Sequence, residues 1–356
     1  MATLCEMTSV PVKSETYEQV DHLGIFISDN EREVITLVNY TFLCRFISLF
    51  GIISNLINLV IFYRQGLNST INISFFALAL SDLCCSFFQQ LFNFYVSPLF
   101  DDLPVQFADV QHLTIGVQRG IFSKITCLIT VYITAERCLC VAFPLHIKQI
   151  ITTRRTTAII VLIYLLTVCS FVPLYTSSYL GWKFYPEWNQ TRIGLIAYTE
   201  NQAASAIVYS MLAISGLLSF IAVIILAAIL IAKLREKSAW VKTANAQKEK
   251  AGSLSKRDRA TMRMVVLIVS ILIICYAPST MLGVVTVLEP EFSPGGKYYN
   301  WYYVLWSFAM LFETTNSSVN IFLYLKMSSK YNQTFREIFP CFEKKVMKPT
   351  NSVSEK

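Results

Sequence analysis

Seven stretches of the chain are long and apolar, and shorter polar segments separate them. The stretches cover residues 46–63, 71–100, 110–135, 156–182, 201–232, 264–288 and 298–325. A helix needs about 20 residues to cross the hydrocarbon core of a bilayer, and a backbone exposed to lipid must satisfy its own hydrogen bonds. The pattern therefore predicts an all-α integral membrane protein, a seven-transmembrane helix bundle over residues 37–325.

Composition supports this class. Charged residues make up 15% of the 356 residues, and the mean hydropathy is +0.50, whereas a soluble domain carries about 25% charged residues. The fourth, fifth and sixth stretches contain no charged residue. Ionisable side chains inside a span are costly and usually functional. The few that remain are therefore candidates for function, and they are Asp82, Arg119, Lys124 and Glu313.

The distribution of Lys and Arg predicts the orientation of the bundle. Of the 30 basic residues, 22 lie at residue 64 and in segments 137–155, 233–263 and 326–356. Basic loops stay on the cytosolic side, so we expect a multi-pass plasma-membrane protein with an extracellular N-terminus and a cytosolic C-terminus. The net charge of +7 then reflects topology and attraction to anionic lipid. It gives no support to binding of nucleic acid.

The segments outside the bundle are short. Residues 1–36 are polar and acidic and are expected to form an extracellular tail without a signal-peptide core, so the first span serves as the insertion signal. Apolar residues recur every three or four positions from Tyr331, which predicts an interfacial helix over residues 326–340. Residues 341–356 are expected to be a cytosolic tail, where Cys341 is either a palmitoylation site or a free thiol.

Five short motifs occur in order, each on a different span. They are Ser54-Asn55-Leu56, Leu78-Ala79-Leu80-Ser81-Asp82-Leu83, Ala135-Glu136-Arg137-Cys138, Cys275-Tyr276-Ala277-Pro278 and Asn316-Ser317-Ser318-Val319-Asn320-Ile321-Phe322-Leu323-Tyr324. In this order they resemble the rhodopsin-like (class A) G-protein-coupled receptors over roughly residues 39–341, and the seventh-span motif is similar to the expanded chemosensory-like receptors of molluscs. The resemblance implies an extracellular small-molecule or peptide ligand, a heterotrimeric G protein and arrestin as partners.

The charge pair Glu136-Arg137 closes the third span, where the resemblance implies a switch on the inner face of the receptor. Asp258 lies twenty residues before Pro278. It is either a cross-helix restraint on Arg137 or a solvated charge among basic neighbours. In the family, opening of such a restraint lets the sixth helix swing outward, and Asn320 and Tyr324 of the seventh span belong to the same switch.

Asp82 lies in the middle of a span, where a carboxylate needs polar partners. The partners that the resemblance implies are Asn55, Thr126, Asn316, Ser317 and Asn320. Two interpretations stay open, a hydrated sodium ion held at Asp82 and a protonated Asp82 within a hydrogen-bond network. No other metal and no organic cofactor is expected.

Arg119 is the sharpest candidate for contact with a ligand. It precedes Arg137 by eighteen residues, about five helical turns or 27 Å, and so shares its inward face. A guanidinium there would bind an anionic group, or it forms a structural pair with Glu313. Ser123 and Tyr276 are expected in the same pocket, Tyr276 either at its floor or in ordinary packing. Lys124 points about 140° away from Arg119 and is expected to be structural.

The outer surface departs from the family pattern. His112 stands where the family has a cysteine, and residues 176–202 contain none, so we expect no disulfide there. Asn189-Gln190-Thr191 is a glycosylation sequon in that loop, with Asn189 as the acceptor.

Three functions compete. A ligand-gated activator of a G protein, chemosensory in role, is favoured, and a neuropeptide receptor of the same fold is the alternative. A channel or transporter would show internal repeats or broken helices, which the sequence lacks. No Walker loop, metal cluster or hydrolase elbow is present, so an enzyme is not expected.

Overall fold

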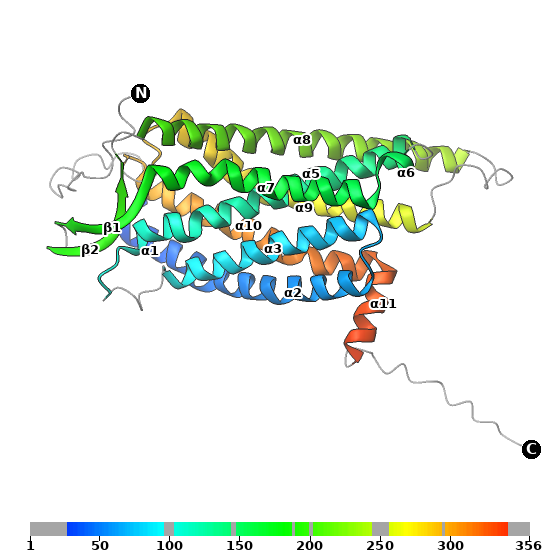
Figure 1. The fold of residues 1–356 in the computed structure, drawn as a ribbon, viewed down its shortest axis with the longest axis horizontal. Coiled ribbons are helices and arrows are strands. Elements are labelled where there is room, and N and C mark those ends of the chain that lie inside the picture. The colour runs from blue at the N-terminus through cyan, green and yellow to red at the C-terminus, as the bar shows by residue number, and fades with distance from the viewer. Residues whose placement is uncertain are drawn as a thin grey trace, which may run out of the picture.

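The computed structural model describes residues 27–95, 103–143, 147–186, 189–198, 202–243, 256–293 and 296–340. Seven long helices run roughly parallel or antiparallel and form one bundle (Figure 1). In chain order they are α1 and α2 (Asp29–Leu37 and Arg45–Arg64, joined by the π-helical Val38–Cys44), α3 (Thr70–Tyr95), α4 and α5 (Phe107–Gln111 and Val117–Ala142, joined by the π-helical His112–Gly116), α7 (Thr153–Ser177), α8 (Gln202–Thr243), α9 (Lys256–Leu288) and α10 (Tyr299–Met327).

The length and composition of these helices fit a membrane protein. Six of them are long and apolar enough to cross a bilayer. α10 has 29 residues, and its inner face carries buried Glu313, Asn316, Ser317 and Asn320. The polar residues thus turn inward and the large apolar side chains of α7 and α8 turn outward, as expected for a bundle surrounded by lipid.

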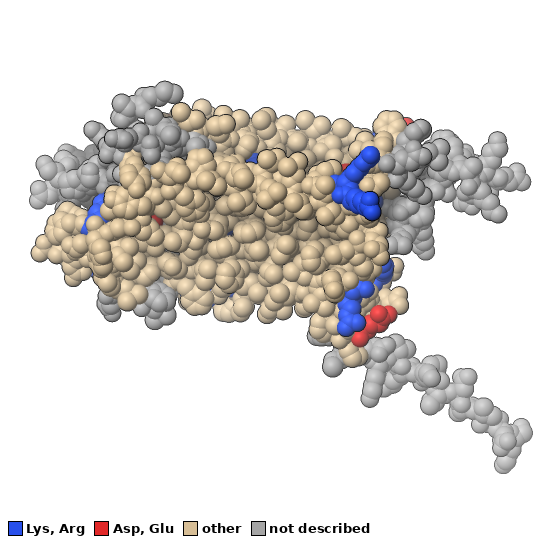
Figure 2. All heavy atoms as spheres, viewed as in Figure 1, with Lys and Arg blue, Asp and Glu red and all other residues tan. Residues whose placement is uncertain are grey.

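α5 is the central helix of the bundle. It packs against α3, α7, α8 and α9, and its buried residues run along its length from Val117 to Val141. The short helix α6 (Ile147–Ile150) follows it. The described Lys and Arg side chains gather mainly at the end of the bundle where α7 begins and α11 lies (Figure 2).

The first helix begins at Asp29, inside the segment expected to be an extracellular tail. Ser28 caps it, with Ser28 N donating to Glu31 Oε2 at 2.9 Å and Glu31 N donating to Ser28 Oγ at 3.3 Å. This reciprocal pair satisfies two backbone donors of the first turn. Tyr299 Oη on α10 then donates to Asp29 Oδ1 at 2.9 Å. The cap at Ser28 and the hydrogen bond from Tyr299 therefore stabilise a helix in this polar segment.

A two-stranded antiparallel hairpin lies at the end of the bundle opposite α11 (Figure 1) and was not expected from the sequence. It consists of β1 (Ser178–Tyr185) and β2 (Gln190–Ala197), in a register that pairs Tyr185 with Gln190. Tyr185 Oη donates to Asp109 Oδ2 of α4 at 2.6 Å. Burial raises the pKa of Tyr185, and the hydrogen bond to Asp109 raises it further, so the phenol stays a donor. The bond fastens the hairpin to α4.

The short helix α11 (Ser329–Ile338) lies within the stretch predicted for an interfacial helix and turns away from the axis of α10 (Figure 1). Ser328 Oγ accepts from Tyr331 N at 3.2 Å and caps it. Tyr331 is buried, and Phe335 and Ile338 pack beside it against the core of the bundle. One apolar face therefore anchors this helix.

Gly51 lies where α2 approaches α3 and α10, and it gives a test of the packing. A Cβ at Gly51 would lie 2.5 Å from Ser318 Oγ and 2.6 Å from Ser86 Oγ, so Gly51→Ala must displace both hydroxyls. We expect a loss of about 1–3 kcal/mol, measured as a lower thermal unfolding midpoint of the detergent-purified protein. Gly283→Ala is the matched control, because a Cβ there meets no atom within 4 Å. An equal effect of the two substitutions would contradict this packing.

Candidate ligand pocket and coupling switch

A buried ion pair joins α5 to α10 in one half of the bundle. Arg119 Nη2 lies 3.0 Å from Glu313 Oε2, and each side chain is only 10% exposed. Charges removed from water need a partner, and these two provide it for each other. Arg119 therefore forms the structural pair that was one of its two expected roles.

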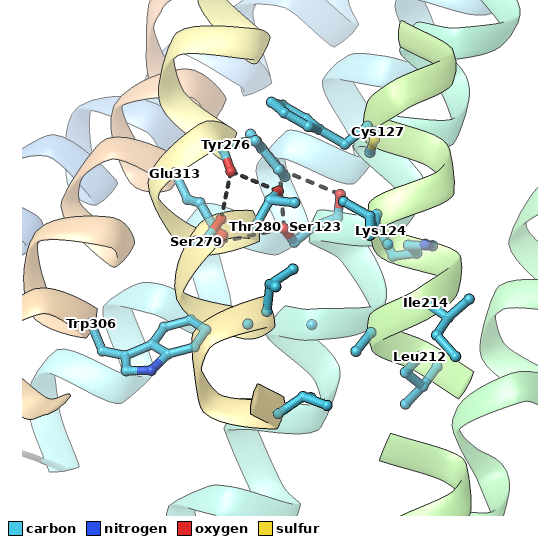
Figure 3. Close-up of a pocket in the computed structure, with 18 of the residues that line it drawn as sticks. Ser123, Lys124, Cys127, Leu212, Ile214, Tyr276, Ser279, Thr280, Trp306 and Glu313 are labelled. Carbon is cyan, nitrogen blue, oxygen red and sulfur yellow. Dashed lines mark hydrogen bonds between the residues drawn. The ribbon is translucent and has the colours of Figure 1, made fainter. Parts of the chain in front are cut away.

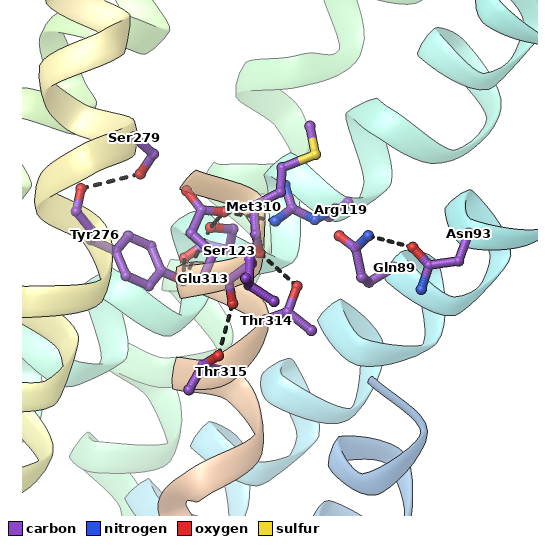
Figure 4. Close-up of polar contacts among 11 residues, drawn as sticks. Gln89, Asn93, Arg119, Ser123, Tyr276, Ser279, Met310, Glu313, Thr314 and Thr315 are labelled. Atoms are coloured by element: carbon purple, nitrogen blue, oxygen red, sulfur yellow. Dashed lines mark hydrogen bonds and ion pairs between the residues drawn. The ribbon is translucent and has the colours of Figure 1, made fainter. Parts of the chain in front are cut away.

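Hydroxyl groups extend this pair toward α9 (Figure 4). Ser123 lies one turn along α5 from Arg119, and its Oγ is 3.1 Å from Tyr276 Oη and 3.4 Å from Glu313 Oε2. Tyr276 Oη also donates to the carbonyl oxygen of Ser123 at 3.3 Å. Tyr276 lies two residues before Pro278, inside α9. The four residues named for a ligand pocket, Arg119, Ser123, Tyr276 and Glu313, thus form one polar cluster.

A cavity of about 400 Å³ opens beside the cluster, and residues of α5, α7, α8, α9 and α10 line it (Figure 3). Its volume falls in the range of about 300–1,000 Å³ that is usual for small-molecule sites. Ser123, Tyr276 and Glu313 line the cavity, whereas Arg119 lies behind Glu313 and is not part of the wall. Lys124, which was expected to be structural, lines the cavity. Its Nζ donates to Ser215 Oγ on α8 at 3.1 Å.

Asp82 lies at the centre of a second polar cluster and is fully buried. Thr126 Oγ1 donates to its Oδ1 at 2.9 Å, and Asn320 Nδ2 donates to its Oδ2 at 2.8 Å. Ser81 Oγ lies 2.9 Å from Thr126 Oγ1. These bonds join α3, α5 and α10, and both oxygens of the carboxyl group have a donor.

Asn55, Asn316 and Ser317 were also predicted to surround Asp82, but Asn55 bonds to backbone carbonyl groups instead. Asn55 Nδ2 donates to the carbonyl oxygens of Gly51 at 2.9 Å and of Ser317 at 2.6 Å, so it joins α2 to the backbone of α10. Asn316 and Ser317 are buried on α10. The side chain of Asn316 takes no part in the hydrogen bonds to Asp82 described above.

The charge pair at the end of α5 is an ion pair between sequence neighbours. Arg137 Nη2 lies 2.6 Å from Glu136 Oε1, and the Glu136 side chain is 1% exposed. Thr70 Oγ1 on α3 donates to the same oxygen at 2.6 Å. Glu136 therefore links Arg137 to the start of α3. Asp258 lies on α9, but its side chain is outside the part that the structure describes.

Tyr324, near the same end, is 1% exposed and packs within a cluster of aromatic rings. Its ring centroid lies 5.1 Å from that of Phe62, 5.2 Å from that of Phe75 and 5.4 Å from that of Tyr331. These rings come from α2, α3 and α11. In this conformation Tyr324 therefore packs toward α2, α3 and α11.

Of the two expected modification sites, the structure describes Asn189. Asn189 ends the hairpin turn with a positive φ of 49°, a backbone conformation that asparagine tolerates well. The turn is exposed at this residue, so the sequon is sterically open. Cys341 lies outside the described residues.

Comparison with known proteins supplies the class and the family. The fold is that of a seven-helix membrane protein with a largely apolar cavity beside a buried polar cluster. The chain belongs to the serpentine type 7TM GPCR chemoreceptor family Srw, whose model matches residues 39–342. It is also 22% identical over 334 residues to a probable G-protein coupled receptor of Caenorhabditis elegans, covering 89% of this chain and 73% of that protein. The family is not enzymatic, and the resemblance to G-protein-coupled receptors is confirmed at this level.

Proposed function

We propose that this protein is a chemosensory receptor of the plasma membrane that binds a soluble cue in the cavity and activates a heterotrimeric G protein. One observation carries the proposal. The same buried helix, α5, brings Ser123 to the cavity and Glu136 and Arg137 to the opposite end. A ligand that changes the position of α5 relative to α9 therefore acts on the element that holds the charge pair.

The proposed mechanism is a shift between two packings of the bundle. Residues of α9 form part of the cavity wall, so a ligand that binds more tightly when α9 has moved favours that arrangement. At the other end Arg137 leaves Glu136 and, where Asp258 restrains it, Asp258 as well. Tyr324 leaves its aromatic cluster, and a G protein enters the space. Arrestin would compete for the same opening, and anionic lipid would contact the basic end of the bundle.

The polar cluster at Asp82 is proposed to hold a sodium ion in the inactive arrangement. Asp82 supplies the charge, and Thr126, Ser317 and Asn320 supply further oxygen atoms, the ligands that hard cations prefer. The carboxylate–amide bond between Asp82 and Asn320 then changes when the bundle rearranges.

The sodium proposal has a direct test. We expect sodium chloride to raise the thermal unfolding midpoint of the purified receptor relative to N-methylglucamine chloride at equal ionic strength, because an ion bound only to the folded state stabilises it. Asp82→Asn should remove the difference, since the amide lacks the charge. A sodium effect that persists in Asp82→Asn would rule out this site, and its absence from both proteins would favour a protonated Asp82.

A ligand screen tests the function itself. Cells that express the receptor with a promiscuous Gα subunit would be exposed to amino acids, amines, organic acids and short amidated peptides, with intracellular calcium as the readout. We expect an agonist among the small water-soluble compounds. Activation by peptides alone would favour the neuropeptide alternative. An ionic current that persists without G protein would favour the channel alternative, against which the family match already speaks.

A further inference from the structure

The cavity wall carries one positive charge that no described carboxylate balances. Lys124 and Glu313 are the residues of the described wall that are charged at neutral pH. Glu313 is paired with Arg119 at 3.0 Å. The guanidinium of Arg119, which is not part of the cavity wall, therefore neutralises the charge of Glu313. No ion pair involves Lys124 in the described part of the chain, where its hydrogen bond goes to the neutral hydroxyl of Ser215.

The surroundings of Lys124 are otherwise apolar or already bonded. Its Nζ lies against α8 at Gly216, where a Cβ would be 3.9 Å away. On α9, Ser279 Oγ and Thr280 Oγ1 donate to the carbonyl oxygen of Tyr276 at 3.1 and 2.8 Å. Their hydrogens are thus directed into the helix. An ammonium group has three donor hydrogens, and Ser215 takes one of those of Lys124.

The rest of the wall suits the apolar body of a ligand. Phe171, Leu217, Phe220, Val284 and Trp306 line it. An amine would meet a carboxylate at Glu313 that already accepts from Arg119 and lies near Ser123, and it would also meet repulsion from Lys124. An acid group finds the opposite situation, because attraction between charges is strengthened where water is excluded.

We propose that the cavity takes a small organic anion whose acid group binds Lys124 and whose apolar body lies along α7, α8, α9 and Trp306 of α10. This inference rests on the proposed receptor function, and it names the class of ligand. It also moves the anion contact from Arg119, which is held behind Glu313, to Lys124.

The thiol of Cys127, which also lines the cavity, makes the charge measurable without knowledge of the ligand. Sulfonatoethyl methanethiosulfonate is anionic, and trimethylammonioethyl methanethiosulfonate is cationic. Each forms a mixed disulfide with a thiolate and releases methanesulfinate, so no other reactant is needed. The two rates would be measured on the full-length receptor in nanodiscs by mass spectrometry of the Cys127 peptide, each divided by its rate on free glutathione.

We expect the normalised rate at Cys127 to be about tenfold higher for the anionic reagent than for the cationic one, which corresponds to about 1.4 kcal/mol. Lys124→Met should abolish this preference and Lys124→Arg should keep it, while Cys127→Ala verifies the peptide assignment. Equal normalised rates in the parent protein, or a preference for the cation, would overturn the inference. Absence of any reaction would overturn it too, because a soluble anion could not reach the site. Basal nucleotide exchange on a G protein, measured on the same samples, tests the receptor function separately.

Discussion

Arg137→Ala is expected to abolish receptor-catalysed nucleotide exchange on a heterotrimeric G protein while the receptor still reaches the cell surface. Arg137 bonds Glu136, which in turn accepts from Thr70 on α3. In the proposed mechanism the guanidinium leaves Glu136 and becomes available to a G protein. Alanine has no guanidinium, so this step cannot occur in the variant. Exchange would be measured with a fluorescent GTP analogue on purified receptor and G protein.

A background with higher basal activity makes this loss measurable without an agonist. Glu136→Gln removes the charge that holds Arg137, so we expect it to raise basal exchange severalfold. Adding Arg137→Ala should cancel the increase. Arg336→Ala is the matched control, because Arg336 is an exposed arginine on α11 whose Nε donates to Asn332 Oδ1 at 2.8 Å. Full exchange by the Glu136→Gln, Arg137→Ala protein would show that Arg137 is not the switch.

Glu313→Ala is expected to destabilise the receptor by about 3–5 kcal/mol, because it leaves the guanidinium of Arg119 buried without its counter-charge. The pair is 10% exposed on both sides and lies 3.0 Å apart. Replacing both residues with methionine should recover most of the loss, since apolar side chains need no partner there. The thermal unfolding midpoint in detergent and the amount of receptor at the cell surface would both report the change.

An exposed ion pair of the same chain provides the control for that experiment. Lys233 and Glu236 also lie 3.0 Å apart, but their side chains are 46% and 68% exposed. Glu236→Ala should therefore change stability by less than about 1 kcal/mol. If Glu313→Ala and Glu236→Ala had equally small effects, the Arg119–Glu313 pair would not hold α5 and α10 together.

The helices could be predicted from the sequence, but some of their ends could not. A charge-poor stretch of some 20 residues has few alternatives in a membrane, so the spans were clear. The start of the first helix at Asp29 depends on a reciprocal cap at Ser28 and on Tyr299, far away in the chain. The hairpin depends in the same way on pairing between strands and on the bond from Tyr185 to Asp109.

Some residues of the site could likewise be predicted from the sequence, whereas the position of the cavity could not. Asp82 and Asn320 lie in two of the motifs, the family resemblance implied Thr126, and the structure brings these three together. Helical spacing correctly placed Lys124 away from Arg119, but spacing alone could not locate the cavity. The cavity extends from Glu313 on α10 toward α8, so Lys124, which donates to Ser215 on α8, also lines it. Only the packing of neighbouring helices decides which of two adjacent faces meets a ligand.

Tethering a charged group to Cys127 tests most directly whether the cavity is coupled to the switch. Receptor in nanodiscs would be modified with sulfonatoethyl methanethiosulfonate, modification of Cys127 verified by mass, and nucleotide exchange on the G protein measured before and after. We expect the exchange rate to change, and the change to disappear in Cys127→Ala and in Arg137→Ala. An unchanged exchange rate on receptor fully modified at Cys127 would contradict coupling between the cavity and Arg137.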